Sequence, residues 1–144
     1  MDAKQLKQAV RSLHRYFIWA DEMKKHFEIW CQKVVDDGIH DRFSAEMIRA
    51  DLYMSFWYGE LFVVVEGWRE LELTDPAVDA LLKSPNVKLL KLYRNGVFHF
   101  QMKYFDKRFQ GFITGTDTVP WVRDLHEAFS SHFLARFAKE NKGV

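Results

Sequence analysis

The segment from Leu92 to Gln101 brings Arg94, Asn95 and His99 close together along the chain. A histidine can exchange a proton near neutral pH, and a guanidinium can bind an oxyanion through paired hydrogen bonds. On one regular helix, Asn95 and His99 would share a face, whereas Arg94 and His99 would lie about 140° apart. Gly96 weakens the helix between them, so a local bend could bring Arg94 and His99 together. A symmetric dimer is a second route, because two copies of the segment would face each other across a twofold axis.

The pattern Arg94-Asn95-x-x-x-His99 resembles the signature of the HEPN superfamily. In that signature an arginine, usually followed by a polar residue, is separated from a histidine by a total of four to six intervening residues. HEPN domains are small helical bundles of about this length, and many dimerise so that two motifs line one cleft. Many are metal-independent endoribonucleases that act as toxins of toxin–antitoxin systems or in phage defence. The resemblance covers most of this chain only at the level of its helix pattern.

The resemblance implies that Arg94 and His99 are catalytic residues and that Asn95 is a polar helper. The reaction would be attack of an RNA 2′-hydroxyl on the adjacent phosphate, with the histidine moving a proton and the arginine stabilising negative charge. We expect no metal and no cofactor for this reaction. Some HEPN toxins carry a tyrosine two residues after the histidine, which an antitoxin modifies. That position is Gln101 here, which puts this style of neutralisation in doubt.

Charge is distributed unevenly along a chain whose formal net charge is only +1. Residues 36–75 carry ten acidic and three basic side chains, a net of −7, whereas residues 83–108 carry seven basic side chains and one acidic, a net of +6. Near-neutrality excludes a generally cationic nucleic-acid binder but permits one confined RNA surface. From local charge and rings we expect backbone phosphates to contact Lys91, Lys103, Lys107 and Arg108, and bases to stack on Tyr93, Phe98 or Tyr104.

Other polar residues carry weaker signals. Asp36, Asp37, His40 and Asp41 could hold a metal, but nothing in their spacing fixes a ligand geometry, and a solvated turn explains them as well. Glu60 and Glu66 lie in the most apolar part of the chain, where a carboxylate is costly unless it is paired or faces outward. Glu66 and Glu70 would share a helix face, as many solvated pairs do.

Hydrophobic periodicity indicates how these residues are positioned. Apolar residues recur at steps of three and four from Ala3 to Val35, which predicts one long amphipathic helix. Further helices are expected over Ser44–Leu73, Pro76–Lys83 with Asp75 as N-cap, Val87–Lys103 and Thr118–Lys139, with a loop over 106–118. The second helix is apolar on two sides, which is typical of a central helix. We therefore predict one all-α domain spanning residues 1–144, an up-and-down antiparallel bundle of four main helices plus one short helix.

Composition bounds the remaining expectations. Cys31 is the only cysteine, so no intrachain disulfide is possible, which suits a reducing cytosol. No apolar run approaches the ~20 residues of a membrane span, and we expect a cytoplasmic protein with no membrane partner. The expected partners are RNA, a second copy of the chain in a homodimer, and an antitoxin or regulatory protein. The alternatives are a non-catalytic helical module that binds a nucleotide, RNA or protein, and a structural bundle within a larger complex.

Overall fold

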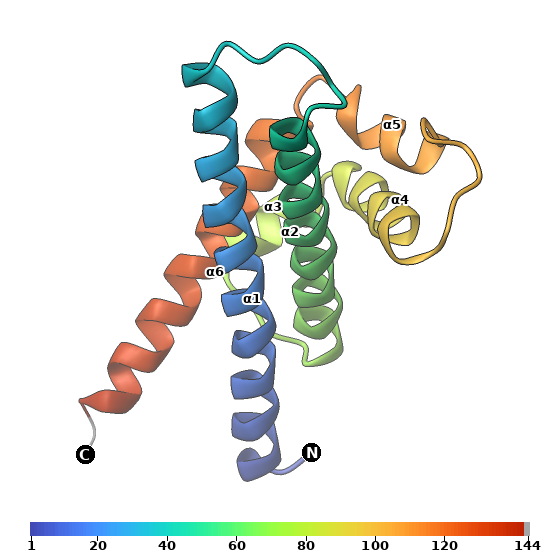
Figure 1. Cartoon of the computed structure of the whole chain (residues 1–144). Coiled ribbons are helices and arrows are strands. Elements are labelled where there is room, and N and C mark those ends of the chain that lie inside the picture. The colour runs from blue at the N-terminus through green and yellow to red at the C-terminus, as the bar shows by residue number, and fades with distance from the viewer. Residues whose placement is uncertain (143–144) are drawn as a thin grey trace.

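The computed structural model describes residues 1–142, and every regular element in that range is a helix. The expected all-helical bundle is confirmed (Figure 1). The six helices are α1 (Ala3–Asp36), α2 (Ala45–Glu70), α3 (Pro76–Leu81), α4 (Asn86–Phe98), α5 (Lys107–Ile113) and α6 (Thr118–Asn141). Four are long and two are short, one short helix more than predicted, because α5 occupies much of the segment expected to be a loop.

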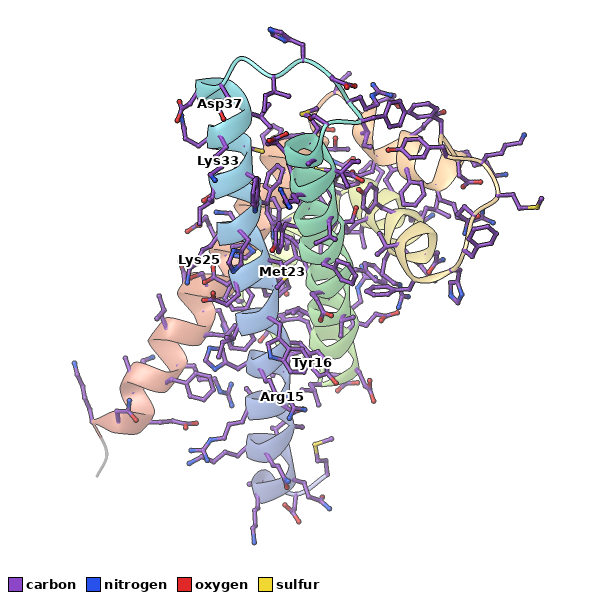
Figure 2. All side chains as sticks on the ribbon, in the orientation of Figure 1. Arg15, Tyr16, Met23, Lys25, Lys33 and Asp37 are labelled. Carbon is purple, nitrogen blue, oxygen red and sulfur yellow. The ribbon has the colours of Figure 1, made fainter. Side chains whose placement is uncertain are left out.

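The first two helices form an antiparallel hairpin (Figure 1). Ser44 caps α2 by accepting a hydrogen bond from the backbone N–H of Met47, as a helix start at this residue requires. Tyr16 and Met23 project from α1 on the side of α2, whereas Lys25 projects from the opposite side (Figure 2). The apolar stripe of α1 is most deeply buried in its first half, at Val10, Leu13, Phe17 and Ala20.

The second helix is central, as its two apolar sides predict, and it packs against both α1 and α4. Its C-terminal half supplies much of the core through Trp57, Tyr58, Leu61, Phe62, Val64, Val65 and Trp68. Its N-terminal half behaves differently, because Ile48, Leu52 and Phe56 are 49%, 45% and 40% exposed. These three residues, one turn apart, are the α2 apolar stripe, which no helix among residues 1–142 covers.

The fourth and fifth helices pack on each other beside α2, on the side away from α1 (Figure 1). Gly96 makes their close approach possible, since a Cβ atom there would lie 2.9 Å from two ring atoms of Phe109. α4 is shorter than predicted: it ends at Phe98, not at Lys103. The physical reason is tertiary, because the ring of Phe98 packs against Gly59 of α2 and the chain then turns toward α5.

The last helix closes the core from the remaining side. Phe129 of α6 packs edge-on against Trp68 of α2, and Phe133 packs against Phe17 of α1. Its C-terminal half diverges from α1 (Figure 1). The outcome is a core of α1, α2 and α6, with α4 and α5 attached to α2 as a pair that carries the Arg94-Asn95-x-x-x-His99 motif.

Candidate functional site

Arg94 lies on α4 and is held against α2 by a two-point ion pair. Its Nη2 donates to Oε1 of Glu66 at 2.9 Å, and its Nη1 donates to Oε2 at 3.4 Å. The guanidinium carbon lies 5.0 Å from the ring centroid of Phe62, a cation–π arrangement. The side chain is only 23% exposed, and its Nε is buried without a hydrogen-bond partner among residues 1–142. These contacts hold the guanidinium in one pose over α2.

His99 does not lie within a helix. It is the C-cap of α4, with extended backbone angles of φ −123° and ψ 126°, and its N–H donates to the carbonyl of Asn95 at 3.0 Å. The prediction that Asn95 and His99 share one face of a continuing helix is therefore wrong. The imidazole of His99 is exposed, and no hydrogen bond joins it to another group in the described chain. An exposed imidazole at this position is free to meet an external ligand.

The loop after His99 is anchored by a network that sequence reasoning missed. The Gln101 amide nitrogen donates to the carbonyl of His99 at 2.7 Å, and its amide oxygen accepts from Nη1 of Arg108 at 2.8 Å. The same Nη1 donates to Oδ1 of Asp106 at 3.0 Å. Hydrogen bonds from the Arg108 backbone and guanidinium lower the pKa of Asp106. Gln101 therefore anchors the loop. Arg108, which was expected to contact phosphate, uses Nη1 of its guanidinium to bind Gln101 and Asp106 within that loop.

The other residues expected to bind RNA divide into two groups. Lys91, Lys103 and Lys107 are exposed and form no ion pair within residues 1–142, so their ammonium groups are accessible. Tyr104 is 61% exposed, with its ring centroid 5.5 Å from that of Phe43. Phe98 is half-exposed, and Phe100 and Met102 are the most exposed apolar side chains of this loop, at 92% and 93%. These groups surround His99 along the chain.

Tyr93 does not fit the stacking role expected for it. It is 1% exposed, and its hydroxyl lies 3.1 Å from Oγ of Ser55. Its ring packs edge-on against Phe109 of α5. Burial raises its pKa. Tyr93 is a core residue that attaches α4 to α2 and α5, because the face of α4 opposite Lys91 and Leu92 is the face that meets the other helices.

The carboxylates of α2 have different environments. Glu66 faces Arg94 and is 46% exposed, so it is a surface partner of the motif. Glu60 has one carboxyl oxygen that is buried without a partner in the described residues, and burial raises its pKa. The sequence singled out Glu66 as an acid within an apolar helix. Its partner Arg94 lies 28 positions away along the chain, so the sequence did not show the pairing. Only the packing of α4 on α2 brings the two together.

The candidate site is an exposed surface. A groove of about 860 Å³ lies elsewhere, between α3 and α6, where Asp75, His132 and Arg136 contribute to its lining, and it contains none of the motif residues. Among residues 1–142, no three metal-ligating side chains gather closely enough to hold a metal ion, including those of the turn around His40. Within the same range, no helix combines the length and apolar character needed to cross a membrane.

The fold and the site together define an all-helical bundle in which one helix carries a largely covered, ion-paired Arg94 and ends at an exposed His99. Comparison with known proteins yields no match, since no family model fits the chain and neither a curated protein nor a solved structure matches it significantly.

Proposed function

We propose that this protein is a metal-independent endoribonuclease of the HEPN type. The observation that carries the proposal is the exposed imidazole of His99 at the end of the helix that presents Arg94, with Lys103 and Lys107 following in the next segment. A phosphate-binding guanidinium, a proton-transferring imidazole and accessible ammonium groups are the parts that RNA cleavage needs. Asn95, which lies in the last turn of α4, would help to orient the bound phosphate.

In the proposed reaction, His99 takes the proton of a ribose 2′-hydroxyl, and that oxygen attacks the neighbouring phosphorus. The bond from phosphorus to the 5′ oxygen of the next nucleotide breaks, leaving a 2′,3′-cyclic phosphate, and the departing oxygen takes up a proton. Arg94 stabilises the charge that develops on the non-bridging oxygens. The chemistry involves two proton transfers, and the motif of one chain contains one histidine.

A homodimer would supply the second histidine. Support for self-association comes from the α2 apolar stripe, which lies on the same helix as Glu66 and continues to Phe98 through the edge-on contact of Phe56 and Phe98 at 6.0 Å. Leu92 of α4 is also 44% exposed. Contiguous exposed apolar side chains of this kind mark interaction surfaces. A twofold axis through this surface would bring two motifs toward one RNA strand.

The biological setting that the HEPN resemblance favours is a toxin–antitoxin system or phage defence, with an antitoxin or regulatory protein controlling activity. Because Gln101 anchors the His99 loop and occupies the position of the modifiable tyrosine, we propose that control acts by binding to the protein and not by modification of that position.

The experiment that tests the function is incubation of the purified protein with total RNA in excess chelator. Wild type is expected to cleave, and His99→Ala and Arg94→Ala are each expected to lose at least about a hundredfold in rate, within the usual range for a general base or an electrostatic stabiliser. His40→Ala and Arg15→Ala serve as matched controls, because both residues are exposed and lie outside the α4–α5 segment. Cleavage that survives both motif substitutions, or that requires a divalent metal, contradicts the proposal.

A second candidate is a non-catalytic module that binds RNA, a nucleotide or a protein partner. One observation favours it: the guanidinium of Arg94 is already paired with Glu66 in this structure. This alternative predicts measurable RNA affinity that weakens with salt, without turnover by wild type. The chelator assay and a binding titration on the same preparation separate the two functions.

A further inference from the structure

The ion pair of Arg94 and Glu66 uses the part of the guanidinium that an anion from outside would need. A guanidinium offers two-nitrogen edges that can bind a carboxylate or a phosphate through two parallel hydrogen bonds. Glu66 occupies the edge formed by Nη1 and Nη2. The other two-nitrogen edge includes Nε, which is buried and has no partner among residues 1–142. Two-point binding of a phosphate is therefore open only at the edge that Glu66 fills.

We infer that Glu66 is a built-in anion that masks the phosphodiester-binding edge of Arg94. The guanidinium is restrained from swinging to a new position, because it lies over the ring of Phe62 and the Arg94 side chain is only 23% exposed. The carboxylate can move away, because Glu66 is 46% exposed and sits on the solvent side of α2. A bound phosphodiester would displace the carboxylate and take over its two hydrogen bonds, with Glu66 turning into solvent.

Masking has an electrostatic consequence. In the masked state the charges of Arg94 and Glu66 cancel, so attraction of RNA to this surface depends on the exposed ammonium groups of Lys91, Lys103 and Lys107. Neutralising Glu66 would unmask the site. This inference rests on the proposed function for the identity of the anion as RNA, whereas the masking itself concerns any phosphate group.

The first test is affinity for a fluorescently labelled 2′-O-methyl oligonucleotide, which cannot undergo 2′-hydroxyl attack, measured by anisotropy. Glu66→Gln is expected to bind about tenfold more tightly than wild type, because a charge-assisted pair no longer competes. Glu70→Gln is the matched control: it removes the same charge one turn along the same exposed side of α2 and is expected to stay within about twofold, because an exposed charge is screened. In an Arg94→Ala background the gain from Glu66→Gln is expected to vanish.

The inference is overturned if Glu66→Gln binds no better than Glu70→Gln, or if its gain persists without Arg94. Glu66→Ala provides a second unmasked variant, and thermal unfolding of each variant reports whether it is folded. Titration of inorganic phosphate, followed through the Arg94 Nε–H signal in NMR spectra, tests masking without RNA. A signal that responds at a clearly lower phosphate concentration in Glu66→Gln than in wild type supports masking even if no RNA is cleaved, and the absence of cleavage overturns the proposed function alone. A protein that cleaves RNA without any affinity gain in Glu66→Gln overturns the masking alone.

Discussion

The indole of Trp57 donates a hydrogen bond from Nε1 to Nδ1 of His126 at 3.0 Å, in the centre of the helical core. Because an indole N–H can only donate, Nδ1 of His126 must be unprotonated, and the imidazole is neutral. Its other nitrogen, Nε2, lies 2.9 Å from Oδ1 of Asp21 and donates to it. These two hydrogen bonds join α2, α6 and α1 through the His126 imidazole, which is 1% exposed. Burial lowers the pKa of His126.

This arrangement predicts that the fold is sensitive to mild acid. Below the ordinary histidine pKa of about 6.5, the unfolded chain binds a proton that folded His126 resists, so stability falls as pH is lowered, by up to about 1.4 kcal/mol per pH unit. Burial also lowers the pKa of His14, which adds to the same slope. Urea unfolding between about pH 7.5 and 5 measures the effect. His126→Gln is expected to be less stable but to show a flatter pH dependence, and an unchanged slope would contradict the assignment.

Asp21 responds in a separate pH range. Burial raises its pKa, but hydrogen bonds from His126 and Lys25 outweigh that effect, and the net shift is downward. A carboxylate whose pKa is lowered in the folded state stabilises the fold when the pH is above the ordinary aspartate pKa of about 4. That contribution is lost only as the pH falls below about 4. The loss between pH 7 and 5 therefore reports on histidines.

The α4–α5 contact is tested by adding a single methyl group. Gly96→Ala would place Cβ 2.9 Å from the ring of Phe109 and 3.3 Å from Cβ of Arg108. We expect a loss of about 1–2 kcal/mol, because overpacking exceeds the gain of about 1 kcal/mol in helix propensity. Gly111→Ala is the matched control within α5, since its Cβ would meet Leu89 at an ordinary 3.5 Å and should gain about 0.5–1 kcal/mol. Chemical denaturation measures the free energy of unfolding of both variants and of wild type. A Gly96→Ala variant as stable as wild type would show that α5 moves freely.

The loop anchor is tested at Gln101. Gln101→Ala removes both the bond to the His99 carbonyl and the bond from Arg108, so His99 is expected to lose its fixed position. If the protein cleaves RNA as proposed, the rate should fall about tenfold, since small displacements of a catalytic group are costly, while the unfolding midpoint changes little. Gln110→Ala, at an exposed position of α5, should leave the rate unchanged. Equal rates for the two variants would show that the anchor does not position His99.

The α2 apolar stripe predicts self-association. Leu52→Glu places a charge in the middle of the stripe, at a side chain that is 45% exposed in the single chain. Wild type is expected to sediment as a dimer and this variant as a folded monomer, because a buried unpaired charge disfavours the interface. Ile29→Glu on α1, where the side chain is 54% exposed, is expected to leave the dimer intact. A wild-type monomer at all concentrations would remove the shared-cleft part of the proposed function.

Helix positions and starts could be predicted from the sequence because they depend on near neighbours. The three- and four-residue steps of α1, the Ser44 cap of α2 and the Asp75-Pro76 start of α3 are local patterns, and the structure contains all three. The spacing of apolar residues along a helix determines which side chains share one face, whatever the rest of the chain does.

Tertiary packing decided the site. The motif could be found by its spacing, but α4 ends where the ring of Phe98 packs against Gly59 of α2, a contact that no local pattern includes. The same packing brings Glu66 onto Arg94 and buries Tyr93. It leaves the α2 apolar stripe uncovered, although its periodicity resembles that of a core face. Periodicity in the sequence establishes which residues share a helix face, whereas the neighbour that each face meets is set by the packing free energy of the whole chain.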